Sequence, residues 1–152
     1  MPHTASPLPR PGHIGLNVSD IDRSVSFYKD LLGFQVLLEG GAGDRKFAFL
    51  GDGGKPVLTL WQQSTGSFEK RRPGLHHFAF EVGAVDEVRR LEAKLHARGI
   101  HFHYEGIVPH VEGAASGGIY FEDPDGIRLE VYAPEGVHGA APVAGAPSCG
   151  FF

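Results

Sequence analysis

The stretch that decides the fold is Gly74-Leu75-His76-His77-Phe78-Ala79-Phe80-Glu81-Val82. Its large apolar side chains alternate with polar or small ones, which predicts a strand with one buried face. An earlier stretch, residues 11–18, has the same form, and His13 falls on His77 when the two stretches are aligned. Two strands with a histidine at the matching place indicate that the chain is built twice from one plan.

The composition is that of one globular domain, or of two small modules that share a core. Of the 152 residues, 41% are hydrophobic and 21% are charged. A net charge of −4 without a basic stripe argues against nucleic acid as a partner. No apolar run approaches the roughly 18 residues that cross a membrane, and residues 1–11 have no apolar signal core, so we expect a cytoplasmic protein. The single cysteine, Cys149, excludes an internal disulfide and a cysteine-based zinc cluster.

Periodicity divides the chain into two similar halves joined by a polar linker. We expect a loose arm at residues 1–10, a first module at 11–62, a linker at 63–73, a second module at 74–134 and a flexible tail at 135–152, rich in Gly, Ala and Pro. Each module has the pattern of a strand, a helix and three strands, or βαβββ. In the second module, the strand after the helix is expected at residues 101–105.

The last strand of each half supports the repeat. Leu58-Thr59-Leu60 falls on Leu129-Glu130-Val131, and the same alignment places Asp52 on Asp123 in the preceding turn. The difference between this alignment and that of the histidine strands is absorbed in the loop before Gly118. Agreement in element order, helix position and turn position predicts a duplicated fold.

Strand alternation puts both histidines on the face of the sheet that the helices leave open. In the second half, Phe78 and Phe80 pack on the helix, while His77 points the other way. If the two curved sheets face each other, this open face lines a cavity. The small residues Gly15 and Ala79 would then leave room for a ligand beside the histidines.

On the last strand, Glu130 stands between Leu129 and Val131 and would face the same cavity. A carboxylate there is costly to bury unless it is paired or binds a cation. Two histidines and one carboxylate, here His13, His77 and Glu130, form an arrangement that binds a divalent metal. Such a site leaves positions open for substrate and for oxygen or water.

Each of these residues also has an ordinary structural interpretation. A lone histidine at the start of a strand is more often a surface residue, Glu130 could pair with Arg128, and His76 could take the role of its neighbour His77. The repeat favours His77, because His77 matches His13. Three candidate ligands at matched strand positions favour the metal site over these alternatives.

The chain resembles the vicinal oxygen chelate superfamily, which includes glyoxalase I, extradiol ring-cleaving dioxygenases, fosfomycin-resistance enzymes and bleomycin-binding proteins. The resemblance covers about residues 11–134 and rests on the stretches 12–16, 27–34, 75–80 and 120–130. It implies an α+β fold in which two paired βαβββ modules form an open, eight-stranded, barrel-like sheet around a metal-site cavity. It also implies His13, His77 and Glu130 as the metal ligands.

Positions outside these ligands separate the branches of the superfamily. Glyoxalase-like members typically carry a glutamate as fourth ligand where this chain has Thr59, which weakens the lyase interpretation. Tyr120 stands where extradiol enzymes have an active-site tyrosine, and His110 roughly where they have a histidine beside the ligands. The acid–base histidine of those enzymes has no match near Gln62, and the threonine of fosfomycin enzymes has no match after His13.

We therefore expect an enzyme that uses one divalent metal and acts on a small, oxygen-rich molecule chelated through neighbouring oxygens. The first hypothesis is an extradiol-type dioxygenase with Fe(II), in which Tyr120 hydrogen-bonds the substrate and His110 shuttles a proton. One alternative is a glyoxalase-like lyase or isomerase with Mn, Ni, Co or Zn. Another is a non-catalytic protein that binds an aromatic antibiotic.

The expected partners are a small-molecule substrate and a second copy of the chain. Phe49, Trp61, Arg128 and Tyr132 are expected to line the cavity and contact the substrate. The resemblance implies a homodimer. The sequence leaves open whether the two modules pair within one chain or swap between two.

Overall fold

The computed structural model describes residues 8–152. Its first half contains β1 (Ile14–Val18), α1 (Ile21–Ser26), a π-helical turn η1 (Phe27–Leu31), β2 (Gln35–Gly40), β3 (Phe47–Asp52) and β4 (Lys55–Gln62). Its second half contains β5 (Phe78–Glu81), α2 (Val85–Ala97), β6 (Val108–Pro109), β7 (Gly117–Glu122), β8 (Arg128–Ala133) and a short 3-10 turn, η2 (Ser148–Gly150). The arm expected at residues 1–10 lies outside the described residues as far as residue 7. None of the described helices is long and apolar enough to cross a membrane.

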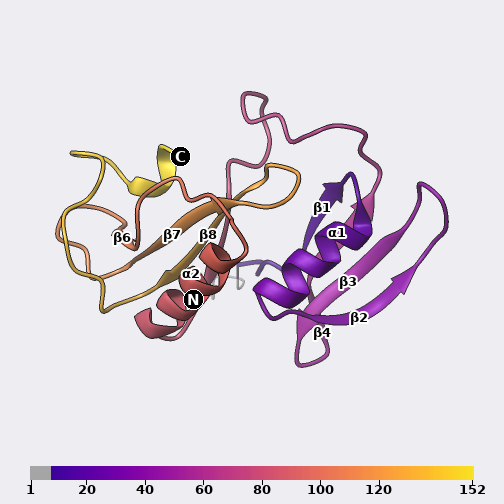
Figure 1. The fold of residues 1–152 in the computed structure, drawn as a ribbon, viewed down its shortest axis with the longest axis horizontal. Coiled ribbons are helices and arrows are strands. Elements are labelled where there is room, and N and C mark those ends of the chain that lie inside the picture. Colours follow the sequence, from indigo (N-terminus) through magenta and orange to yellow (C-terminus); the bar gives the residue numbers. More distant parts are fainter. Residues whose placement is uncertain (1–7) are drawn as a thin grey trace, which may run out of the picture.

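Each half forms its own four-stranded sheet, and the two sheets have the same topology (Figure 1). The strand orders are β1-β4-β3-β2 and β5-β8-β7-β6. In both sheets the first strand of the half runs parallel to the last, and the remaining pairs are antiparallel. The duplication expected from the two histidine strands is therefore visible in the topology.

The first helix changes pitch before it ends. The Asp20 side chain accepts a hydrogen bond from a backbone N–H of the first turn and so caps the helix. The last turn widens into η1, which buries Tyr28 and Leu31. Gly33 follows with φ of 82°, a conformation that glycine adopts without strain, and it turns the chain into β2.

The second strand of the second half, which follows the helix, departs from the prediction. A strand over residues 101–105 is wrong, because only Phe102 forms a β-bridge there, with Phe121. The strand that pairs with the start of β7 is β6, which is two residues long. Just beyond this pair of residues, the N–H of His110 donates to the Ser116 carbonyl at 3.0 Å.

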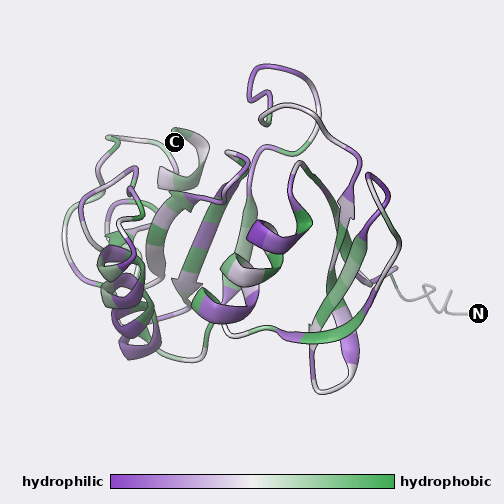
Figure 2. Ribbon diagram, turned by 45° about the vertical axis from the view of Figure 1, so that its right-hand side comes forward, coloured by the Kyte–Doolittle hydropathy of each residue, from purple (hydrophilic) through white to green (hydrophobic). Residues whose placement is uncertain are grey.

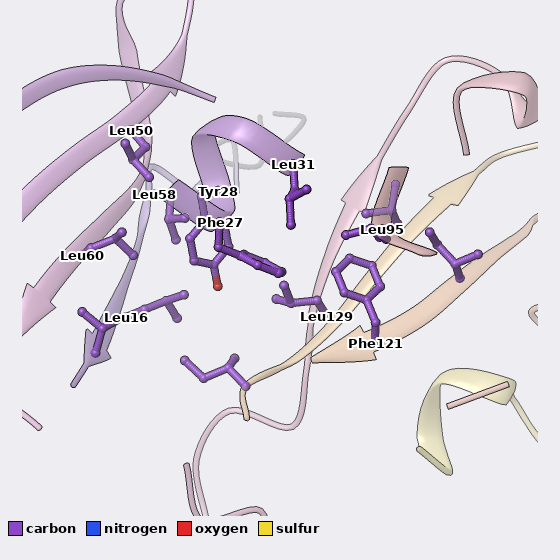
Figure 3. Packing of buried hydrophobic residues seen from close by; sticks show 14 of the residues in the cluster. Leu16, Phe27, Tyr28, Leu31, Leu50, Leu58, Leu60, Leu95, Phe121 and Leu129 are labelled. Atoms are coloured by element: carbon purple, nitrogen blue, oxygen red, sulfur yellow. The ribbon is translucent and has the colours of Figure 1, made fainter. Parts of the chain in front are cut away.

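One hydrophobic core lies between the two sheets and is shared by both halves (Figure 3). Its members include Leu16 and Leu58 from the first sheet, Phe121 and Leu129 from the second, and Tyr28, Leu31 and Leu95 from the helical segments. Figure 2 shows hydrophobic residues recurring along the strands of both sheets. The helical segments therefore fill the space between the two sheets.

This shared core decides where the remaining faces of the sheets point. Because side chains alternate along a strand, the opposite face of each sheet lies on the outside, away from the core. The sheets are not closed into a barrel, and no strand of one sheet pairs with a strand of the other among the described residues. The expected eight-stranded sheet around a common cavity therefore does not form within the described chain, because α1 and η1 occupy the inner side.

Polar contacts also join the first helix to the turn between β7 and β8. Tyr28 Oη donates to Asp123 Oδ2 at 2.9 Å, and both residues are buried. The N–H and hydroxyl of Ser19 and the guanidinium of Arg23 donate to Asp125. Burial raises the pKa of Asp123, and burial together with the charge of Asp123 raises that of Tyr28. Hydrogen bonds between buried groups thus hold the two halves in one arrangement.

The residues after β8 lie along the second half (Figure 1, yellow). The N–H of Val137 donates to the Ala115 carbonyl at 2.9 Å, and the Val137 side chain is buried. Farther along, the N–H of Ser148 in η2 donates to the His110 carbonyl at 2.7 Å. The tail expected at 135–152 thus runs against the second sheet, and its flexibility stays a prediction.

Candidate metal and substrate site

The outer face of the second sheet carries a cluster of titratable residues. Glu130 in β8 lies opposite Tyr120 in β7, so their side chains share one face. Leu129 and Val131, on either side of Glu130, point into the core. His77 lies just before β5, the strand that runs parallel to β8, and its side chain reaches Glu130.

Glu130 is the centre of this cluster, with only 2% of its surface exposed. Its Oε1 lies 2.6 Å from Nε2 of His110 and accepts a hydrogen bond from Tyr120 Oη at 3.1 Å. Its Oε2 lies 3.4 Å from Nε2 of His77. One carboxylate oxygen is therefore held by two side chains, while the other faces the histidine predicted as a ligand.

His77 presents one ring nitrogen to Glu130 and the other to its chain neighbour. Its Nδ1 lies 2.8 Å from Nδ1 of His76, which leaves Nε2 to face the carboxylate. Burial lowers the pKa of His77, although the charge of Glu130 acts in the opposite sense. A lower pKa favours the neutral imidazole, which is the form that binds metals.

His110 and Tyr120 orient the carboxylate. Nδ1 of His110 lies 2.8 Å from the Ser116 hydroxyl, so a neutral ring can accept a hydrogen bond there and donate from Nε2 to Glu130. Tyr120 is fully buried, and burial together with Glu130 raises the pKa of its phenol. The phenol therefore stays protonated as a donor. Nothing in the sequence marked Ser116, because a serine in a Gly-rich loop belongs to no motif.

The donor set fits a divalent metal. Two ligand atoms that each lie about 2.1 Å from one ion at a tetrahedral angle are about 3.4 Å apart. Nε2 of His77 and Oε2 of Glu130 have this separation. Their second donor atoms, Nδ1 and Oε1, are engaged by neighbouring side chains, as is common for metal ligands.

The structure does not bring His13 to this cluster. His13 is exposed and lies just before β1, at the first sheet. Among the residues that the structure describes, the metal-ligating atoms gathered within 4.8 Å of one another belong to His77, Glu130 and Cys149. The predicted set of three ligands is therefore divided between two sheets whose outer faces do not meet within the chain.

Two of the four predicted substrate contacts lie on the first sheet. Phe49 and Trp61 pack with Phe47, with ring centroids 5.5 to 5.8 Å apart. Thr59 lies beside them and accepts a hydrogen bond from the Trp61 indole N–H at 3.1 Å. A Cβ on Gly15 would lie 3.3 Å from Thr59 Oγ1. The room that was expected beside Gly15 is therefore largely filled.

The other two predicted substrate contacts, Arg128 and Tyr132, lie on the second sheet with the metal-ligating cluster. Tyr132 Oη donates to a carboxylate oxygen of Glu81 at 2.7 Å, and its ring centroid lies 5.0 Å from that of His110. Arg128 donates to the carbonyl oxygen of Phe152. Both side chains are thus within reach of a molecule bound on this face.

Cys149 is a member of the cluster that the sequence did not single out. It lies in η2, which carries it to the outer face of the second sheet beside His77 and Glu130. Burial, with a further contribution from Glu130, raises the pKa of its thiol. No local pattern could have marked it, because the surrounding Gly-, Ala- and Pro-rich segment has no hydrophobic period.

Comparison with known proteins supports this fold. Catechol-2,3-dioxygenase of Bacillus subtilis is 32% identical over 124 residues, which are 80% of this chain and 40% of that protein. The chain thus spans less than half the length of this relative. The protein YwkD of Bacillus subtilis, whose function is uncharacterized, is 32% identical over 125 residues, which are 79% of this chain and 93% of YwkD.

A solved structure and a family model agree with these relatives. The glyoxylase/bleomycin resistance protein/dioxygenase domain from Frankia sp. EAN1pec has a TM-score of 0.69 and 28% identity, with 84% of this chain and 98% of that chain covered. The family model described as Glyoxalase/Bleomycin resistance protein/Dioxygenase superfamily matches residues 10–131, which include both halves. The resemblance inferred from the sequence is thus confirmed, and the chain belongs to this superfamily.

Proposed function

We propose that the chain is a divalent-metal-dependent enzyme that binds a small, oxygen-rich molecule through two neighbouring oxygens. The proposed reaction is extradiol-type ring cleavage with Fe(II). The observation that supports it most is the placement of Glu130. One of its oxygens is held by His110 and Tyr120, and the other faces Nε2 of His77 at 3.4 Å.

Each residue of the cluster has a role in this proposal. His77 Nε2 and Glu130 Oε2 bind the metal, and His13 is the third ligand. Bound iron would polarise the substrate oxygens and orient substrate and dioxygen. Tyr120 keeps its proton and donates it in a hydrogen bond at Oη. His110, with a hydroxyl on Nδ1, holds or releases a proton at Nε2 beside the bound substrate.

A site with three protein ligands is favoured over the four-ligand glyoxalase type because of Thr59. Its hydroxyl donates to the Ile14 carbonyl at 3.4 Å and accepts a hydrogen bond from Trp61, so both of its partners belong to the first sheet. Two imidazoles and one carboxylate leave positions open for substrate and oxygen. The similarity to a catechol dioxygenase supports the same choice.

The third ligand, His13, would come from a second copy of the chain. The first sheet carries His13 and an aromatic surface in which Trp61 is 37% exposed. Laid against the outer face of the second sheet of another copy, it would bring His13, Phe49 and Trp61 to that copy's Glu130. A two-fold homodimer would then hold two equivalent sites.

Oxygen uptake tests the reaction. Protein loaded with Fe(II) without oxygen is mixed with a panel of catechols in buffer of known oxygen content. Uptake by the wild type that disappears in Glu130→Gln and His77→Ala supports the dioxygenase. No uptake across the panel would sink it. Activity that persists with redox-silent zinc would instead identify a lyase or isomerase. Antibiotic binding that is unchanged in His77→Ala would identify a binding protein.

Mixing two inactive variants tests the shared site. A dimer that contains one His13→Ala chain and one His77→Ala chain has one site with both histidines and one with neither. Metal binding and activity should therefore reappear when the two variants are mixed and allowed to exchange. If the site lay within one chain, every site would lack a histidine, and mixing would restore nothing.

A further inference from the structure

We propose that Cys149 is a ligand of the metal held by His77 and Glu130, so that the C-terminal segment covers this site with a thiolate. This inference rests on the metal site proposed above and adds a ligand to it. Its basis is that Sγ of Cys149 and the donor atoms of His77 and Glu130 all lie within 4.8 Å of one another.

The residue before Cys149 is fixed by three hydrogen bonds. The N–H of Ser148 donates to the His110 carbonyl at 2.7 Å, and its hydroxyl donates to the Pro109 carbonyl at 2.7 Å. Its own carbonyl accepts from Tyr104 Oη at 2.9 Å. Ser148 is fully buried. Cys149 is therefore presented by an anchored turn rather than by a loose end.

The segment is anchored a second time beyond Cys149. The Phe152 ring lies 5.6 Å from the ring of His77 and 4.8 Å from that of Tyr120, measured between centroids. Arg128 donates to the Phe152 carbonyl oxygen and its guanidinium carbon lies 5.9 Å from the Phe152 ring centroid. Anchors on both sides hold the thiol over the two predicted ligands.

Binding of the Cys149 thiolate would change which ligands and which metals the site accepts. When Sγ binds the ion, the S–H bond breaks and its proton passes to solvent. With His13 of a second copy, as proposed above, two imidazoles, one carboxylate and one thiolate fill the four positions of a tetrahedral ion. A substrate oxygen can then reach the ion only where Cys149 is displaced or where the ion takes an additional ligand. A thiolate also favours zinc over manganese among the candidate metals.

Cobalt(II) titration under anaerobic, reducing conditions tests the ligand. The wild type should develop the near-ultraviolet charge-transfer band of a cobalt–thiolate bond, together with the visible bands of bound cobalt. Cys149→Ser should keep the visible bands and lose the charge-transfer band. Cys149→Ser should also bind zinc more weakly than the wild type. The loss should be at least about 10-fold, which is the typical cost of losing a residue that hydrogen-bonds a metal ligand. In His77→Ala, both sets of bands should be lost.

Four outcomes separate this inference from the proposed function. Bound cobalt without a thiolate band, and with equal zinc affinity in Cys149→Ser, would overturn the role of Cys149 and leave the metal site intact. A thiolate band that persists in His77→Ala would also overturn it, because the thiol would then bind metal elsewhere. A wild type that binds neither metal would overturn both proposals. Protection of Cys149 from alkylation by zinc, lost in His77→Ala, would support the ligand independently.

Discussion

The contact with His110 is the shortest that Glu130 makes in the candidate site, with 2.6 Å between Oε1 and Nε2. Because Oε2 of the same carboxylate faces His77, this contact orients the carboxylate and leaves one oxygen for a metal. Ser116 in turn holds the other ring nitrogen of His110. A chain of three side chains thus sets the direction of one ligand oxygen.

Removing the imidazole of His110 should weaken metal binding without abolishing it. In His110→Ala, Glu130 keeps the hydrogen bond from Tyr120 but loses its 2.6 Å partner. Losses of this kind typically cost about 10- to 100-fold in metal affinity. Zinc affinity measured by competition with a chelator checks this. His138→Ala, at an exposed histidine, is the control and should bind like the wild type. Equal affinities for all three proteins would contradict the orienting role.

Tyr28→Phe should destabilise the whole chain. The change removes the donor of a buried hydrogen bond and leaves Oδ2 of Asp123 without it. A buried group left without its partner costs about 1–3 kcal/mol in the free energy of unfolding. Urea denaturation measures this difference. Tyr132→Phe is the matched control, because it removes an exposed hydrogen bond to Glu81 and should change the free energy by less than about 0.5 kcal/mol. Equal effects of the two changes would contradict the prediction.

Gly118→Ala should also destabilise the protein, by crowding two strands. A Cβ there would lie 2.1 Å from the Val131 carbonyl oxygen, which is backbone and cannot turn away. Forcing β7 from β8 should cost about 1–3 kcal/mol, as overpacking typically does. Gly66→Ala is the control, since a Cβ at Gly66 would meet no atom within 4 Å. Thermal unfolding of the two variants should separate them, and an unchanged Gly118→Ala would refute the close approach.

Stability should fall at high pH, because all four tyrosines have raised pKa values. Burial is the main cause for Tyr28, Tyr104 and Tyr120, and a hydrogen bond to Glu81 raises the pKa of Tyr132 to about 12. In the unfolded chain, the pKa of tyrosine is about 10. Above that pH the unfolded chain gives up protons that the folded chain keeps, so the free energy of unfolding decreases as pH rises. Below it, the contribution is fully present.

Unfolding by urea at pH values on either side of about 10 measures this dependence. Tyrosinate absorbance, followed in the same samples, should appear together with unfolding. Phenolate that forms in the still folded protein near the ordinary pKa of tyrosine would count against the prediction.

The strand faces could be predicted from the sequence because the period of a strand is two. Alternation placed Glu130 on the face of the sheet that Leu129 and Val131 do not share, and it placed His77 on the same face as Glu130. The repeat likewise predicted one topology for both halves. The resemblance extended this to a superfamily, which the family model confirms over residues 10–131.

Alternation says which face a residue is on, but it does not say what that face meets. The inner side is occupied by α1 and η1, and Tyr28 in η1 reaches Asp123 in the other half, a pairing that no local period reveals. Cys149 escaped prediction for a related reason, since its position depends on hydrogen bonds made by Ser148 to a distant loop.

The joint between Tyr28 and Asp123 also bears on how the chain folds. Two copies of one plan would melt one after the other if each kept a separate interior. Here side chains of both halves pack around the same helical turn, so unfolding of either half would expose the core residues of the other. We therefore expect the chain to unfold as a single cooperative unit. A fragment that ends at the linker would leave its share of the common core exposed to solvent, because the other half would no longer cover it.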